Sequence, residues 1–148
     1  MNLSDDKKKF FERTMHTPDD ETRAAQRAGL REISRKLIPL HRALIEELRV
    51  EYSETVEPVN QPTRLLRLIN EDPFFAWLKP VTTLIVDIDE MARRDFETAD
   101  VEAIVKRVDS LFGSGDGEFS DRYKAVLQRS VDVAAGHAGL RAALSRLR

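Results

Sequence analysis

The stretch from residue 21 to residue 56 constrains the fold most, because its apolar residues recur at helical spacing over about ten turns. These apolar positions are Leu30, Ile33, Leu37, Leu44, Leu48 and Tyr52. At 1.5 Å per residue such a helix is roughly 54 Å long, more than a compact chain of this size accommodates. The helix is therefore expected to bend, break or protrude, with Gly29 and Pro39 as its weak points.

The rest of the chain has the same helical period, and no segment alternates apolar and polar residues as a half-buried strand would. An amphipathic segment with Phe10 and Phe11 is interrupted at Pro18, so residues 1–18 are expected to form an N-terminal arm. Further helices are expected at residues 63–70, from Asp72 and Pro73 to Ala92, at residues 98–112, and from Phe119 and its cap Ser120 almost to Arg148. Pro80 either kinks its helix or separates a leading turn from it. The sequence predicts one all-α domain, 1–148, an antiparallel helical bundle of four main helices plus a short helix and the arm.

Composition excludes several classes of function. The chain has 24 basic and 26 acidic residues and a net charge of −2, which argues against a dedicated binder of nucleic acid or anionic membranes. It has no cysteine, so disulfides, thiolate metal sites and a cysteine nucleophile are excluded. No apolar stretch has the length of a membrane span, and the start resembles no signal peptide, so a cytoplasmic protein is expected.

The common catalytic motifs are missing. Glycine-rich residues 113–117 lack the lysine and hydroxyl residue of a phosphate-binding loop and follow a helix, not a strand. A di-iron bundle needs glutamate three residues before histidine, but Ile38 precedes His41 and Ala134 precedes His137 at that spacing. No serine lies in a nucleophile elbow. We expect no catalytic residue, cofactor or metal, and an enzyme is the less favoured interpretation.

Four arginines lie four residues apart on one face of the long helix, and we call them the arginine ridge. They are Arg23, Arg27, Arg31 and Arg35. Residues 51–100 hold 5 basic and 11 acidic residues, so the middle of the chain is acidic. A solvated face is the simpler interpretation. The alternative is docking on an acidic partner, including the acidic middle of a second copy.

Three polar residues interrupt apolar stripes, and each suggests an inward side chain: His41, Asp89 and His137. Each alone fits a satisfied structural residue. Short connections favour helices that alternate in direction. With this arrangement and a rise of 1.5 Å per residue, all three residues lie at one level of the bundle, which predicts a common polar cavity. That cavity would hold either a water network or a ligand.

Two other features also have two interpretations. Gly136 and Gly139 weaken the last helix, which favours either close helix packing or room for a small ligand beside His137. Trp77, placed by the helical period on the flank of its helix, forms with Phe74 and Phe75 either part of the core or a binding platform.

The segments DPFFAWLKP (residues 72–80) and LIVDIDE (residues 84–90) resemble a stretch in small uncharacterised bacterial helical proteins. The resemblance implies a bacterial, cytoplasmic and helical protein and no particular activity.

These observations favour a non-enzymatic helical bundle that acts through protein–protein contact or self-association. A small-molecule or metal site near His41 and His137 is the first alternative, and an enzyme that uses this site is the second. Phe10, Phe11 and Leu30 are expected to be partly exposed, and a homodimer would cover them. No nucleic-acid or membrane partner is expected.

Overall fold

The structure is a computed structural model that describes the backbone of residues 3–113 and 115–147, and the side chains from residue 20 onward within those ranges. This part of the chain contains helices joined by turns and loops and no strand, so the all-α prediction is confirmed. The elements are α1 (Leu3–Thr55), α2 (Pro62–Glu71), the 3-10 helix η1 (Pro73–Leu78), α3 (Lys79–Arg93), α4 (Thr98–Phe112), α5 (Glu118–Arg129) and α6 (Val131–Leu147). Among them, no helix has the length and apolar content that crossing a membrane requires.

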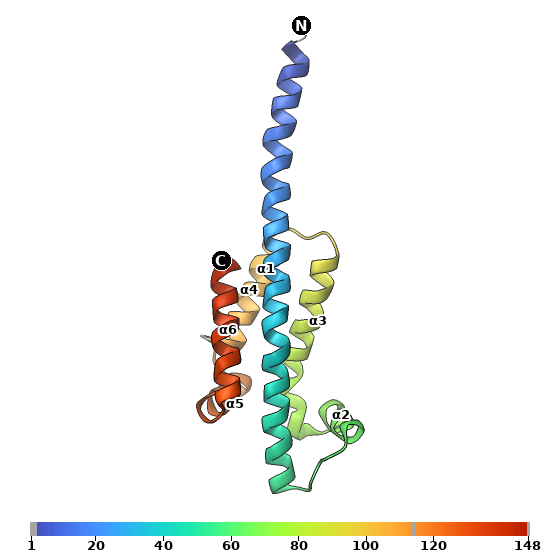
Figure 1. Ribbon diagram of the computed structural model, residues 1–148, viewed down its shortest axis with the longest axis vertical. Helices are drawn as coiled ribbons and strands as arrows, with labels where there is room; N and C mark the ends of the chain where they lie inside the picture. The colour runs from blue at the N-terminus through green and yellow to red at the C-terminus, as the bar shows by residue number, and fades with distance from the viewer. Residues whose placement is uncertain (1–2, 114, 148) are drawn as a thin grey trace.

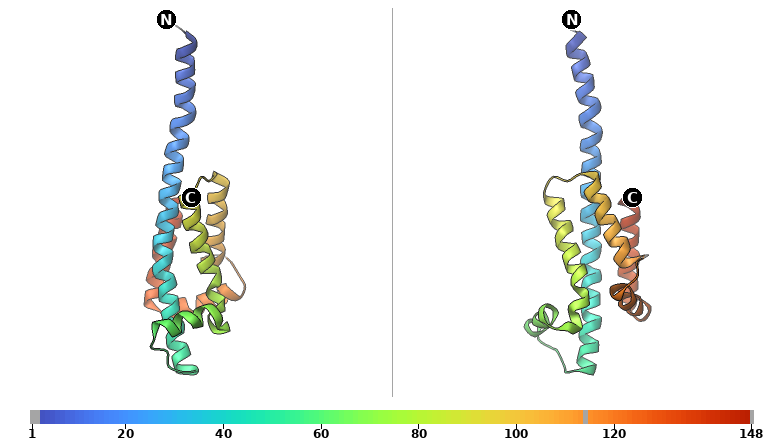
Figure 2. Two further views of the ribbon diagram at one scale, coloured as in Figure 1. Left: turned by 90° about the vertical axis from the view of Figure 1, so that its right-hand side faces the viewer. Right: turned by 180° about the vertical axis from the view of Figure 1, so that it is seen from behind.

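Helix α1 is the central element of the molecule. It packs against α3 on one side and α6 on the other, and its N-terminal part extends well past both (Figures 1 and 2). The core is formed by the apolar stripe of α1 and the inner faces of α3, α4 and α6. Its fully buried aliphatic side chains include Ile33, Leu37, Leu40, Leu44, Leu84, Ile88, Ile104 and Leu140.

Helix α1 is continuous, which corrects the expected break at Pro18. A proline removes one backbone hydrogen bond, and the helix continues on both sides of it. At Pro39 the flanking residues Leu37 and Leu40 are fully buried, so core packing holds the helix through this proline. Of the three predicted outcomes, the helix protrudes. The side chains of Phe10 and Phe11 lie outside the described residues.

Leu30 is fully buried, so the expectation that it would be partly exposed is wrong. The reason is the position of the C-terminal end of α6, where Leu147 packs directly against Gly29. The bundle therefore covers α1 to this level, and exposure begins further towards the N-terminus.

The segment around Pro73 follows the sequence prediction. Asp72 Oδ1 accepts a hydrogen bond from the Phe74 amide at 2.8 Å and caps η1, which Pro73 begins. Pro80 lies in the first turn of α3, so it separates a leading turn from the helix proper. Trp77 is buried against Phe119 and belongs to the core. The sequence placed it on the flank because an α-helical period of 3.6 was assumed, whereas the 3-10 helix η1 has three residues per turn.

The expected final helix is two helices, which is a second correction. Ser130 has extended backbone (φ −113°, ψ 119°) and separates α5 from α6. Its hydroxyl accepts a hydrogen bond from the Val133 amide at 3.2 Å, as an N-cap does. Val131, the residue directly after this break, is 84% exposed. Ser120 is not a cap, since α5 begins at Glu118 and the Ser120 hydroxyl donates to the Gly115 carbonyl at 2.7 Å.

Candidate functional site

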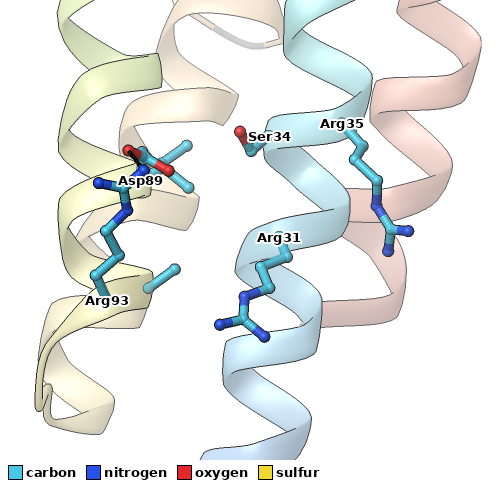
Figure 3. A pocket seen from close by; sticks show the side chains of 7 residues that line it. Arg31, Ser34, Arg35, Asp89 and Arg93 are labelled. Atoms are coloured by element: carbon cyan, nitrogen blue, oxygen red, sulfur yellow. Dashed lines mark ion pairs between the residues drawn. The ribbon is translucent and has the colours of Figure 1, made fainter.

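A groove lies between α1 and α3, close to the level where α1 leaves the bundle. It has a volume of about 410 Å³. Its lining residues are Arg31, Ser34 and Arg35 from α1 and Ile88, Asp89, Ala92 and Arg93 from α3. Figure 3 shows Ser34 and Arg31 on the side of α1 that faces α3, whereas the guanidinium of Arg35 extends away from α3. Asp89 thus lies with two members of the arginine ridge.

The groove is basic, with three arginines against one aspartate. Asp89 pairs with Arg93 at 3.1 Å on α3, and Arg35 pairs with Glu32 at 2.8 Å on α1. Arg31 has no ion-pair partner within the described part of the chain. The guanidinium of Arg31, the hydroxyl of Ser34 and the apolar floor below them can together hold a carboxylate on an apolar side chain or peptide.

Sequence reasoning missed Ser34 and Arg93 as groove residues. The spacing contained a signal for both. Arg93 follows Asp89 by four residues, the distance of a helical ion pair, and Ser34 follows Arg31 by three, which places both on one face of α1. The sequence alone does not show that these faces of α1 and α3 lie opposite each other.

The arginine ridge divides into structural and exposed members. Arg27 turns inward, where its guanidinium donates to the Ala92 carbonyl and, at 3.3 Å, to the Arg94 carbonyl. It also lies over the ring of Phe96, 5.0 Å from the centroid. Arg27 therefore holds the C-terminal end of α3 against α1, whereas Arg23, Arg31 and Arg35 are exposed.

His41 lies at the interface of α1 and α3, where its Nε2 is 3.2 Å from the Thr82 hydroxyl. The side chain is half-buried, not fully buried as the apolar stripe suggested. Burial lowers the pKa of His41 below its ordinary value of 6.5. This histidine is a polar residue satisfied by a neighbouring helix.

His137 lies in a separate cavity of about 190 Å³, bordered by α4, α5 and α6. Its Nδ1 is 2.7 Å from the hydroxyl of Tyr123, a side chain only 2% exposed. Burial raises the pKa of Tyr123 well above its ordinary value. Burial and the nearby charge of Arg141 lower the pKa of His137. Arg141 is itself paired with Asp109 at 2.9 Å.

The structure does not bring His41, Asp89 and His137 together in one cavity. Leu40 and Gly136 make the contact between α1 and α6 at this level. His41 follows Leu40 and His137 follows Gly136, and the side chains of consecutive residues point about 100° apart round a helix. The two histidines therefore share a level but face α3 and α5. In the described ranges, no three histidine, cysteine or carboxylate residues are grouped so as to hold a metal ion.

The two histidines predict a pH-dependent stability. Because folding lowers both pKa values below 6.5, the folded state favours the neutral rings and binds fewer protons than the unfolded chain. The free energy of unfolding therefore has its full value above pH 6.5, and it decreases as the pH falls below 6.5. Urea denaturation across this range measures the effect. The matched control is the double variant His41→Gln, His137→Gln, and an identical pH slope in both proteins would contradict the prediction.

No protein-family model matches this chain, and comparisons with curated proteins and with solved structures also found no match. The geometry of the chain itself therefore carries the functional argument.

Proposed function

We propose that this protein is a non-enzymatic helical module that acts by associating with itself, with α1 as the contact element. The observation that supports this most is the continuation of α1 past the rest of the molecule (Figure 1). The first hydrogen bonds of α1 to other elements, among the described side chains, are made by Gln26 to Thr98 and by Arg27 to the Ala92 carbonyl. We call residues 3–25 the projecting part of α1.

A helix that projects in this way needs a partner. The projecting part is about 35 Å long at 1.5 Å per residue. Residues 20–25 are all exposed. Isolated helices in water are only marginally stable, because most helical stability in proteins comes from packing an apolar face. A second chain packed along the projecting part would supply what the bundle does not.

The charges near the base of the projecting part also favour a protein partner. The groove beside it presents Arg31 to an acidic side chain of a bound chain. The acidic middle of the sequence offers such residues on a second copy. These are long-range, exposed charges, so they favour encounter and orientation more than affinity.

The proposal includes the arrangement of the bundle and its setting. The colour order runs in opposite directions along α1 and α3, and again along α4 and α6, which supports an antiparallel bundle of these four helices (Figures 1 and 2). The resemblance of residues 72–80 and 84–90 to bacterial helical proteins supports a setting in a bacterial cytoplasm.

Sedimentation equilibrium of the full chain tests self-association. The weight-average mass is expected to rise above the monomer mass of 16.9 kDa as concentration increases. The double variant Phe10→Ser, Phe11→Ser should shift this rise to higher concentration, because it removes the largest apolar side chains of the projecting part. Val131→Ser, which removes an exposed apolar side chain of α6, is the matched control and should behave as wild type. A mass that stays at 16.9 kDa throughout would refute self-association.

A further inference from the structure

The sequence of the projecting part has a charge order that reverses sign about its centre. Next to its centre lie Glu12 and Arg13, and its other charged groups are the acidic pair Asp5 and Asp6, the basic triplet Lys7, Lys8 and Lys9, the acidic triplet Asp19, Asp20 and Glu21, and Arg23. Lys9 and Asp19 lie five residues either side of Thr14, and Lys8 and Asp20 lie six. The reversal continues outward, with Lys7 and Glu21 seven residues from Thr14 and Asp5 and Arg23 nine.

This order fits one mode of pairing between two identical helices. If two projecting parts lie antiparallel with a two-fold axis at Thr14, position 7 of one copy is opposite position 21 of the other, and position 5 is opposite position 23. Every one of these opposed positions then has charges of opposite sign. A parallel pairing in register would instead place each triplet beside the same triplet of the other chain, where like charges repel.

Resting on the proposed self-association, we infer that the partner of the projecting part is a second copy of this chain, bound antiparallel with the two-fold axis at Thr14. Such an interface is isologous, since the same surface of both copies forms it and the assembly closes at two chains. The helix continues without interruption across the whole segment, so the register is maintained from Leu3 to the bundle.

Charge and apolar content have separate roles in this interface. Exposed ion pairs contribute little affinity each, but together they select one orientation and one register. Phe10, Phe11 and Met15 lie within about one turn of Thr14. The antiparallel arrangement therefore brings the apolar residues of both copies to the centre of the interface, with the charged triplets at its two ends.

Charge reversal in the full chain tests this arrangement. The first variant carries Lys7→Glu, Lys8→Glu and Lys9→Glu, and the second carries Asp19→Lys, Asp20→Lys and Glu21→Lys. In each variant alone the opposed triplets have the same sign, so the dimer dissociation constant at low salt is expected to rise about tenfold or more. The variant with both triplets reversed should associate as the wild type does. An equimolar mixture of the two single-triplet variants should form a heterodimer, because both triplets are then acidic in one copy and basic in the other.

Disulfide trapping gives a second measurement of the register. The chain has no cysteine, so a single introduced thiol can pair only with the same thiol of a second chain. Thr14→Cys lies at the two-fold axis and should form a covalent dimer under mild oxidation. Asp5→Cys should not, because the two thiols would be about 27 Å apart. A parallel dimer would trap both variants.

The outcomes separate this inference from the proposed function. If the wild type dimerises but the two charge variants bind as tightly, or if reversing both triplets fails to restore association, the antiparallel register is wrong and self-association remains. If Asp5→Cys is trapped as readily as Thr14→Cys, the register is also wrong. If the wild type is a monomer at every concentration, both proposals fail. Circular dichroism and thermal unfolding check that each variant keeps its fold.

Discussion

Replacing Leu37 with alanine is expected to destabilise the protein by about 2–5 kcal/mol. Leu37 is fully buried on the face of α1 that meets the core, and its neighbours along that stripe, Ile33, Leu40 and Leu44, are fully buried too. Removing three carbons there loses the transfer free energy of those carbons and leaves a cavity. Because a domain of this size is stable by only about 5–15 kcal/mol, the change is a large fraction of the total.

The adjacent residue provides a matched control for this prediction. Ile38 is 42% exposed on the outer face of α1, so Ile38→Ala removes a similar volume from the same turn without opening a cavity in the core. Its effect should stay below about 1 kcal/mol, since alanine also has the higher helix propensity. Denaturant midpoints of the two variants measure the difference. Equal losses would mean that the inner face of α1 is not the one assigned.

The helical stripes were predictable from the sequence because burial selects apolar residues at every turn. Leu37 and Leu44 belong to such a stripe, and both lie in the core. Prolines were less informative than expected. Pro18 and Pro39 interrupt no helix, whereas Ser130, a small polar residue inside an apolar pattern, ends one helix and caps the next. The extended backbone of Ser130 and its side-chain hydrogen bond mark that boundary, and a pattern of apolar residues does not contain this information.

The site was less predictable than the fold, because it depends on which helix lies opposite each side chain. Spacing placed His41 and His137 on the core side of their helices, and the structure puts them at one level. Their directions differ because Leu40 and Gly136, one residue earlier, occupy the contact between α1 and α6. Tyr123 is buried, and its hydroxyl lies beside His137 because the chain turns at Ser130 between α5 and α6.

Replacing Gly136 with leucine is the second large effect that we expect, a destabilisation of about 1–3 kcal/mol. A Cβ atom at Gly136 would lie 3.1 Å from Leu40 Cδ1 and 3.3 Å from Leu40 Cβ, so even the first carbon of a side chain presses on α1. The remaining carbons of leucine would force α1 and α6 apart at this contact. The destabilisation from lost packing is larger than the stabilisation of roughly 1 kcal/mol that comes from replacing a glycine inside a helix.

The same substitution at Gly139 separates packing from helix propensity. A Cβ there would lie 3.5 Å from Lys36 Cδ, an ordinary contact with a flexible side chain, so Gly139→Leu should be neutral or stabilise by up to about 1 kcal/mol. Thermal unfolding of both variants tests the two interpretations of these glycines. If the space beside His137 were open for a ligand, leucine at position 136 would fill it and the protein would lose little stability. A large loss at Gly136 with none at Gly139 means that Gly136 is needed for close contact between α1 and α6.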